Sequence, residues 1–271
     1  MKEYCGIVGI FNLKKISEYL YFSLFSLQHR GQESCGIVFS DFNDVFIHKG
    51  MGLISDVFSR FDFTKYKEKL GFGIGHVRYS TTGNPDIKNI QPFIVEYKGR
   101  IYAIAHNGNL VNSYNLRKKL EEEGTLFQTT LDTEIIMHLI FKSKKEKFED
   151  KLKEALSEIK GAFSLVLFTP DGIYAIKDPN GFRPLCLGKL NNGYVISSES
   201  CAFDLIGAEY IREIEEGEIL FIGKDGLKSY YLPKNKISRC IFEFIYFARP
   251  DSKIFGKSVY VARKKLGENL A

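Results

Sequence analysis

A cysteine near the start of the chain has the position that a nucleophile at a new N-terminus would occupy. Cys5 begins the run Cys-Gly-Ile-Val-Gly-Ile-Phe, whose apolar residues are typical of a short strand. If residues 1–4 are removed, the residue that carries the thiol also carries a free α-amine. An α-amine has a pKa of about 7.7 to 8.0 and a thiol one of about 8.5, so the amine can accept the thiol proton near neutral pH. One residue then supplies both nucleophile and base.

The same cysteine has a plainer interpretation. A cysteine beside a buried strand is often a small apolar side chain that fills the core. While residues 1–4 stay attached, the nitrogen of Cys5 is an amide and cannot act as a base, so removal of this leader would be an activation step. The four residues do not themselves reveal whether cleavage occurs, and both interpretations stay open on Cys5 alone.

Four polar segments lie at the ends of predicted strands and helices. Segment 75–83, Gly-His-Val-Arg-Tyr-Ser-Thr-Thr-Gly, and segment 105–110, Ala-His-Asn-Gly-Asn-Leu, each follow a strand. Segment 131–134, Leu-Asp-Thr-Glu, begins a helix, and segment 27–33, Leu-Gln-His-Arg-Gly-Gln-Glu, ends one. Together with Cys5, these segments resemble the class II glutamine amidotransferases, which are N-terminal-nucleophile hydrolases.

Three segments narrow the resemblance to the amidophosphoribosyltransferase family. They are Ser-Leu-Gln-His-Arg-Gly-Gln-Glu at 26–33, Asp-Pro-Asn-Gly-Phe-Arg-Pro-Leu at 178–185 and Ile-Tyr-Phe-Ala-Arg-Pro-Asp-Ser at 245–252. The resemblance extends from Cys5 to the last residue. Members of this family make 5-phosphoribosylamine from glutamine and phosphoribosyl pyrophosphate in the first step of de novo purine (IMP) synthesis. The resemblance thus implies hydrolysis of glutamine to glutamate and ammonia, and delivery of that ammonia to phosphoribosyl pyrophosphate.

The resemblance assigns the reaction to three residues. Cys5 would attack the side-chain amide carbon of glutamine and become a thioester. The side-chain amide of Asn107 and the backbone N–H of Gly108 would form the oxyanion hole, where loss of one donor typically costs about 100- to 1000-fold in rate. On its own, without the other segments, an Asn-Gly pair rather favours a type I′ hairpin turn.

Four more residues would bind the substrate. Arg78 would hold the α-carboxylate of glutamine, because its planar fork matches a carboxylate, although a surface ion pair is the alternative. Asp132 would pair with the α-ammonium, with a helix N-cap as an alternative or additional role. Thr81 would add a hydroxyl near the carboxylate. Arg30 would orient the N-terminal residue, unless it is only a cation at a helix C-terminus.

Tyr79 and the loop at 80–84 are candidates for a gate, because the loop is a Ser-Thr-Thr-Gly run that could move over the site. His29, His76 and His106 are tempting bases. However, His76 and His106 lie at strand ends, and the α-amine already serves as base, so we expect structural hydrogen bonds from these rings.

The expected cofactors belong to the longer enzyme. The glutaminase step needs none, whereas phosphoribosyl pyrophosphate binds with Mg²⁺. Some family members carry a [4Fe–4S] cluster, and Cys240 lies near the position of one ligand, although cluster-free relatives also have a cysteine there. The family's phosphoribosyl pyrophosphate site, a strand ending in adjacent acidic residues before a Ser/Thr/Gly-rich turn, is not found before Ala271. This chain is therefore expected to be a glutaminase at most.

The apolar pattern predicts an α+β fold. Strands outnumber helices and the helices fall into two groups, which fits two antiparallel sheets with helices outside them. The resemblance implies the same arrangement, a four-layer αββα sandwich. Helices are expected near 16–27, 113–123, 132–140 and 148–159, and strands near 7–11, 36–40, 45–48, 72–77, 93–97, 101–106, 162–168, 173–177, 185–189, 194–198, 219–222 and 227–231.

Three regions follow along the chain. Residues 1–4 are the expected leader, residues 5–240 the glutamine amidotransferase type 2 domain, and residues 241–271 the start of a truncated phosphoribosyltransferase domain. A helical pattern from about Val259 still continues at the last residue, as in a fragment that ends inside a second domain.

Composition limits the remaining possibilities. The 271 residues are 44% hydrophobic, 26% charged and 14% aromatic, which is ordinary for a soluble globular chain. The net charge of +5 comes from Lys and Arg scattered among Asp and Glu, which favours a mixed-charge surface over a nucleic-acid face. No apolar run approaches the roughly 18 residues of a membrane span. Five cysteines without a CxxC pair or disulfide framework indicate the reducing cytoplasm.

Three other functions account for less of the sequence. Another class II amidotransferase could feed ammonia to a sugar phosphate or to aspartate, but residues 246–252 argue against both. A non-catalytic binding domain would keep residues 1–4. A nucleic-acid-binding module rests on the charge of +5 alone. We therefore expect L-glutamine and phosphoribosyl pyrophosphate as substrates, a homo-oligomer at full length, and neither a nucleic-acid nor a membrane partner.

Overall fold

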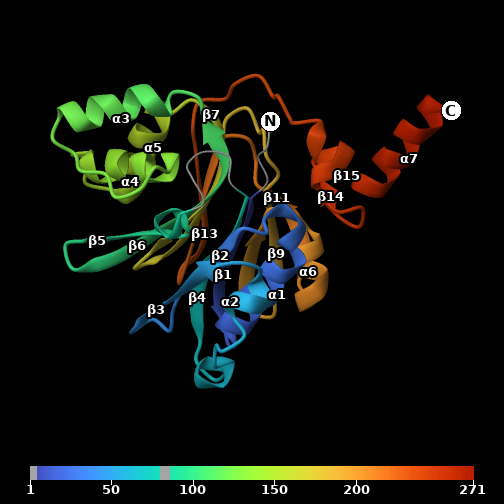
Figure 1. The fold of residues 1–271 in the computed structure, drawn as a ribbon, viewed down its shortest axis with the longest axis horizontal. Helices are drawn as coiled ribbons and strands as arrows, with labels where there is room; N and C mark the ends of the chain where they lie inside the picture. Colours follow the sequence, from blue (N-terminus) through green and yellow to red (C-terminus); the bar gives the residue numbers. More distant parts are fainter. Residues whose placement is uncertain (1–4, 80–85) are drawn as a thin grey trace.

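The computed structural model describes residues 5–79 and 86–271. Residues 1–4, the predicted leader, and residues 80–85, which include Thr81 and most of the predicted gating loop, lie outside the described residues. Two antiparallel sheets lie at the centre of the molecule, with helices on their outer sides (Figure 1).

The first sheet has seven strands in the spatial order β11-β9-β10-β1-β4-β2-β3. Strand β1 is central, and its register with β4 sets Gly6 opposite Val77. Because Cys5 directly precedes β1, this register places the candidate nucleophile beside the end of β4. The strands are β1 (Gly6–Leu13), β2 (Ser34–Ser40), β3 (Val45–Met51), β4 (Gly71–Arg78), β9 (Cys186–Leu190), β10 (Gly193–Ser197) and β11 (Glu209–Glu213).

The second sheet has six strands in the order β13-β12-β8-β7-β6-β5. Its longest strand, β6, pairs with β7 in a register that sets Asn107 opposite Ser164. The strands are β5 (Phe93–Tyr97), β6 (Arg100–Leu110), β7 (Gly161–Thr169), β8 (Gly172–Lys177), β12 (Glu218–Gly223) and β13 (Gly226–Tyr231).

Three hydrophobic clusters hold four layers together. Strand β1 shows how they form: Val8 and Ile10 pack toward helix α1, whereas Ile7 and Phe11 on the opposite face pack against the second sheet. A third cluster lies between the second sheet and helices α3 to α5. The predicted αββα sandwich is therefore confirmed. The helices are α1 (Ile16–Ser26), α2 (Ile54–Val57), α3 (Ser113–Glu122), α4 (Asp132–Lys142), α5 (Phe148–Glu158) and α6 (Cys201–Ile206), with 3₁₀ turns η1 (Gln28–Arg30), η2 (Phe63–Tyr66) and η3 (Ile87–Asn89).

The last thirty residues form a small unit at the edge of the sandwich, drawn in red in Figure 1. It contains a π-helical turn, η4 (Glu243–Phe247), the two-stranded hairpin β14 (Lys253–Ile254) and β15 (Lys257–Ser258), and helix α7 (Val259–Leu270). Ala248, Ile254, Phe255 and Val259 make a separate hydrophobic cluster there. The Phe255 ring also lies 5.3 Å from the ammonium nitrogen of Lys177 in β8, so the unit is attached to the sandwich.

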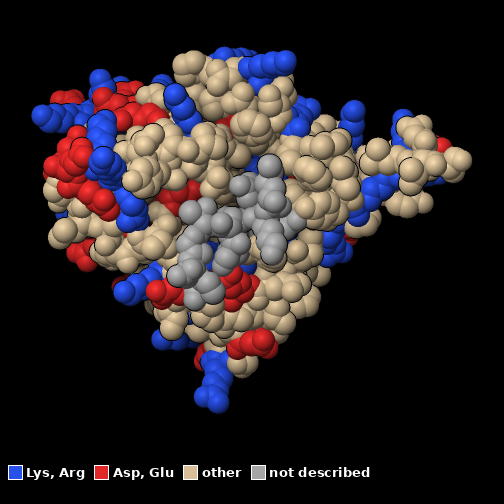
Figure 2. All heavy atoms as spheres, turned by 45° about the horizontal axis from the view of Figure 1, so that its top comes forward, with Lys and Arg blue, Asp and Glu red and all other residues tan. Residues whose placement is uncertain are grey.

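The surface carries both signs of charge. On the face seen in Figure 2, Lys and Arg side chains lie next to Asp and Glu. None of the helices in the described ranges is long and apolar enough to cross a membrane.

Candidate active site

Cys5 lies where β1 meets the end of β4. Its side chain is partly exposed, and the thiol Sγ lies 3.7 Å from the carbonyl oxygen of Tyr79. Tyr79 directly follows β4, and the pairing of Gly6 with Val77 brings the two chain ends together. The position is therefore fixed by strand register, and Cys5 is not a fully buried core residue.

Arg30 reaches Cys5 from the turn after helix α1. Its Nε donates a hydrogen bond to the carbonyl oxygen of Cys5 at 2.9 Å, and the side chain is buried. The next residue, Gly31, lies so close to β4 that an added Cβ would be 2.6 Å from the backbone nitrogen of Arg78. A residue with a side chain would push the turn away, so this glycine seats Arg30 beside the nucleophile.

Arg78 is buried at 2% exposure and forms an ion pair with Glu33. The ion pair of the alternative interpretation does form, but Arg78 is buried and does not lie on the surface. A buried guanidinium held by one carboxylate is a fixed cation, and a planar fork of this kind matches the carboxylate of an amino acid.

Asp132 lies on helix α4, which packs against the second sheet. It is the first residue of helix α4, whose N-cap is Leu131, so the N-cap interpretation of Asp132 is wrong. Its Oδ2 accepts a hydrogen bond from the backbone N–H of Leu110 at 3.1 Å, and Oδ1 lies 3.4 Å from Nδ1 of His106. Burial would raise the pKa of Asp132, but His106 and the hydrogen bonds hold that pKa below its ordinary value. The carboxylate stays charged and suits an ammonium partner.

Asn107 and Gly108 lie inside β6 and face Ser164 and Phe163 of β7, so the hairpin-turn interpretation of this Asn-Gly pair is wrong. The Asn107 side chain is fully buried, and neither of its amide atoms has a hydrogen-bond partner among the described residues. Gly108 has φ +154°, and a Cβ there would lie 2.0 Å from the carbonyl oxygen of Ala162. Buried amides are nearly always paired, so the two unpaired polar atoms of Asn107 mark a candidate ligand-binding point.

The thiol of Cys5 is hard to ionise where it lies. Burial raises its pKa to about 11, although the Tyr79 carbonyl contact, Arg78 and Arg30 lower it; Asp132 raises it further. A thiol with this pKa is ionised to only about one part in 10⁴ at pH 7. Attack on an amide at neutral pH therefore needs a base close to Sγ.

The histidines are engaged elsewhere. The Nε2 of His29 bonds Glu199 at 2.9 Å, and Nε2 of His76 bonds the carbonyl oxygen of His106 at 3.1 Å. Burial lowers the pKa of His76 to about 3, so its ring is neutral. The ring of His106 faces Asp132. These structural bonds leave the α-amine of Cys5 as the base candidate.

Known structures and sequences are similar to this chain over nearly its whole length. A solved structure described as that of the allosteric regulatory enzyme of purine biosynthesis matches with a TM-score of 0.93 and 45% sequence identity, over 98% of this chain and 57% of that one. Amidophosphoribosyltransferase of Bacillus subtilis (strain 168) is 45% identical over 273 residues, which cover 100% of this chain and 57% of the relative. Over its whole length, the chain is similar to the N-terminal part of amidophosphoribosyltransferases.

Two other comparisons agree with this similarity. The chloroplastic amidophosphoribosyltransferase 1 of Arabidopsis thaliana is 47% identical over 274 residues, which cover 100% of this chain and 48% of the relative. The glutamine amidotransferase domain family matches residues 76–204. The chain spans about half the length of these curated relatives and corresponds to the N-terminal, glutamine amidotransferase part of the amidophosphoribosyltransferases.

Two further residues of the site carry no signal in the sequence. Glu199, two residues after the end of β10, and Glu243, in η4, are fully buried and bind the guanidinium of Arg30. They lie 169 and 213 residues from Arg30 in the chain. Neither belongs to a periodic pattern or to a local motif with Arg30, so only the fold reveals the contact.

Cys240 lies next to Glu243, because its carbonyl oxygen accepts a hydrogen bond from the backbone N–H of Glu243 at 3.2 Å. It lines a cavity of about 480 Å³ with Asn109, Arg183, Ile241 and Phe242. Among residues 5–79 and 86–271, no three His, Cys, Asp or Glu side chains converge as a metal site would require. An iron–sulfur cluster is usually held by four cysteines. The described residues therefore do not form a cluster site, and no step is assigned to one.

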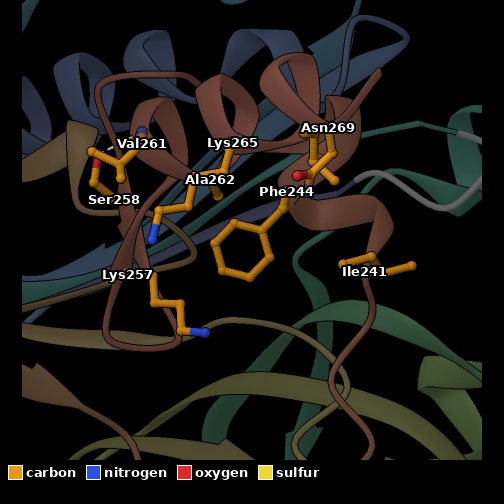
Figure 3. Close-up of a pocket in the computed structure, with 9 residues that line it drawn as sticks. Ile241, Phe244, Lys257, Ser258, Val261, Ala262, Lys265 and Asn269 are labelled. Carbon is orange, nitrogen blue, oxygen red and sulfur yellow. Dashed lines mark hydrogen bonds between the residues drawn. The ribbon is translucent and has the colours of Figure 1, made fainter. Parts of the chain in front are cut away.

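A second cavity, of about 530 Å³, lies between η4 and α7 (Figure 3). Its lining includes Ile241, Phe244, Lys257, Val261, Lys265 and Asn269, and none of the residues around Cys5. This second cavity therefore does not include the groups around Cys5.

Proposed function

We propose that this chain hydrolyses L-glutamine to L-glutamate and ammonia with Cys5 as the nucleophile. The thiolate of Cys5 attacks the side-chain amide carbon, and the carbonyl oxygen becomes an oxyanion. The intermediate collapses, the C–N bond breaks, and nitrogen leaves as ammonia with the proton taken from the thiol. Water then attacks the thioester, which releases glutamate and restores the thiol. Nucleophile, base and oxyanion donors all come from the chain, so we assign no cofactor to this step.

The observation that carries the proposal is the amide of Asn107, which is fully buried and without a partner among the described residues. An unpaired buried amide costs about 1 to 3 kcal/mol, so it is retained where a ligand uses it. Its Nδ2 and the N–H of Gly108 are suited to stabilise the oxyanion. Such donors act on charge that develops in the transition state, and this is where they lower the barrier.

The two ends of glutamine meet opposite charges. Arg78, fixed by Glu33, would bind the α-carboxylate, and Asp132, which stays ionised, would bind the α-ammonium. Both charges already act on the Cys5 thiol, which supports their placement around one substrate. Thr81, outside the described residues, would add a hydroxyl to the carboxylate. Tyr79, whose carbonyl contacts Cys5, would gate the site.

The base requires maturation of the N-terminus. We propose that residues 1–4 are removed and that the α-amine of Cys5 accepts the thiol proton. The hydrogen bonds of His29 to Glu199 and of His76 to the His106 carbonyl support this, because they engage two rings that could otherwise accept the proton. The liberated amine remains next to the Arg30 contact, which fixes the carbonyl of the same residue.

In the longer enzyme, we propose that the ammonia reacts with Mg²⁺-bound phosphoribosyl pyrophosphate to give 5-phosphoribosylamine, the first step of purine synthesis. The names of the relatives support this acceptor. We propose residues 241–271 as the start of the phosphoribosyltransferase domain and a cytoplasmic homo-oligomer for the whole protein. All five cysteines are free, as a reducing compartment would keep them.

Ammonia release from glutamine by the wild-type chain and by Cys5→Ser tests the function. We expect turnover only with the thiol. Equal turnover by Cys5→Ser would exclude Cys5 as the nucleophile.

A further inference from the structure

All three guanidinium nitrogens of Arg30 donate hydrogen bonds. Its Nε binds the Cys5 carbonyl at 2.9 Å, while Nη1 and Nη2 bind the two carboxylate oxygens of Glu243 at 3.0 and 2.9 Å. Glu199 also binds Nη1. The two-oxygen grip of Glu243 sets the plane of the guanidinium, and this plane sets the direction of the Nε–H that holds Cys5.

The charges in this cluster depend on each other. Arg30, Glu199 and Glu243 are at most 1% exposed, and Arg183 adds a further contact to Glu243 at 3.4 Å. Burial disfavours the charge of Arg30, but Glu243 and Glu199 raise its pKa. A buried ion is destabilising once a partner is lost, so loss of one carboxylate forces Arg30 to rearrange.

The second carboxylate also depends on the C-terminal unit. The Oε2 of Glu199 accepts hydrogen bonds from the backbone N–H of Arg249 at 2.9 Å and from Oγ of Ser252 at 2.7 Å. Both groups follow η4 in the chain. Residues 243–252 therefore hold Arg30 twice, directly through Glu243 and indirectly through Glu199.

Helix α7 holds the turn that carries Glu243. The guanidinium of Arg263 donates to the carbonyl oxygens of Phe244 at 2.8 Å and Ala248 at 2.7 Å, near the two ends of η4. In Figure 3, Val261, Ala262 and Lys265 of α7 lie beside the Phe244 ring. A continuous series of contacts therefore leads from α7 through η4 and Arg30 to the nucleophile.

We propose that Glu243 is a positioning residue for Cys5, acting through Arg30, and that this contact transmits the position of η4 and α7 to the glutaminase site. The inference rests on the proposed function of Cys5. Movement of η4 turns the guanidinium, shifts the Cys5 carbonyl, and misaligns the amine and thiol attached to the same Cα. Residues 241–271 thereby contribute to the glutaminase site, in addition to their proposed place at the start of the phosphoribosyltransferase domain.

The test compares Glu243→Gln and Glu243→Asp in the chain that begins at Cys5. A glutamine presents one oxygen and one NH₂ to the guanidinium, so the two-oxygen grip is lost. Displacement of a reacting group by about 1 Å costs about 100-fold, so we expect kcat to fall about 10- to 100-fold. KM for glutamine should stay within about threefold, because Arg78 and Asp132 are not touched. Glu243→Asp, which keeps both oxygens, should restore part of kcat.

Glu218→Gln is the matched control. Glu218 is equally buried and binds Arg212 through two bonds of 2.7 Å, but it lies in β12, away from Cys5. The Glu218→Gln variant should be less stable than the wild-type chain but should have the same kcat. If Glu243→Gln does not fold, Arg263→Ala, at a partly exposed site, replaces it and should lower kcat at least threefold with KM unchanged.

Two results separate the possible failures. Alkylation of Cys5 by iodoacetamide, read by peptide mass, should slow in Glu243→Gln and Arg263→Ala but not in Glu218→Gln. If both Glu243→Gln and Arg263→Ala are folded and keep wild-type kcat and alkylation, the positioning proposal is overturned. If the wild-type chain releases no ammonia while the alkylation rates still separate, the glutaminase proposal fails and the positioning proposal stands.

Discussion

Asn107→Ala should separate activity from stability, because the amide it removes serves the transition state and not the folded chain. Loss of one oxyanion donor raises the barrier by about 2.7 to 4 kcal/mol, which corresponds to a fall in kcat of about 100- to 1000-fold. The same amide is buried without a partner in the described structure, at a cost of about 1 to 3 kcal/mol that the alanine no longer carries. This gain offsets the small cavity, so the free energy of unfolding should change by less than about 1 kcal/mol or rise.

The assay pairs glutaminase kinetics with urea denaturation, and Asn89→Ala is the matched control. Asn89 is also buried, but its Nδ2 donates to Oγ1 of Thr130 at 2.9 Å and its Oδ1 accepts from the N–H of Thr130 at 3.2 Å. Asn89→Ala should therefore lose about 1 to 3 kcal/mol of stability. A stability loss at Asn107 as large as that at Asn89, or a kcat within tenfold of wild type, would refute the reasoning.

Three further predictions follow from the site. Gly108→Ala should lower the free energy of unfolding by about 2 kcal/mol or more, because its Cβ meets the Ala162 carbonyl at 2.0 Å; a stability equal to wild type in urea would contradict this. Asp132→Asn should raise KM about 10- to 100-fold through loss of one charged contact, while kcat stays within about threefold of wild type. Steady-state kinetics measure both constants. A large fall in kcat with an unchanged KM would show instead that Asp132 serves the chemical step. Glu199 has a pKa lowered to about 2, so the stability it contributes is fully present above its unfolded pKa of about 4.3 and is lost as the pH falls toward 2. Urea midpoints at pH 6 and pH 3 should differ more for wild type than for Glu199→Gln, and equal differences would rule out this role.

Local signals in the sequence were sufficient for most of the fold. The expected helix at 132–140 and strand at 93–97 occur as α4 (Asp132–Lys142) and β5 (Phe93–Tyr97), because apolar periodicity reflects which face is buried. Helix α6 (Cys201–Ile206) and strand β11 (Glu209–Glu213) were missed. Both are short and lack a complete period, so their structure is set by packing against neighbours and not by their own pattern.

The candidate site was predictable where motif and position coincide and not where the fold brings distant residues together. Asn107 was identified from its motif, but its place inside β6 was not, because the expected strand ended at residue 106. The alternative interpretation of Asp132, a helix N-cap, is wrong because Leu131 is the N-cap of that helix. The carboxylates of Glu199 and Glu243 carry no signal in the sequence, because their role exists only once β10, η1 and η4 are assembled.

The central claim is that one residue, Cys5, supplies both the thiol and the amine. The most direct measurement is intact and peptide mass analysis of an active preparation after reaction with an electrophilic glutamine analogue. The account predicts a chain whose first residue is Cys5, with one adduct on its sulfur, and an unreactive thiol in a chain that retains residues 1–4. An active chain that still begins at Met1, or an adduct on another residue, would contradict it.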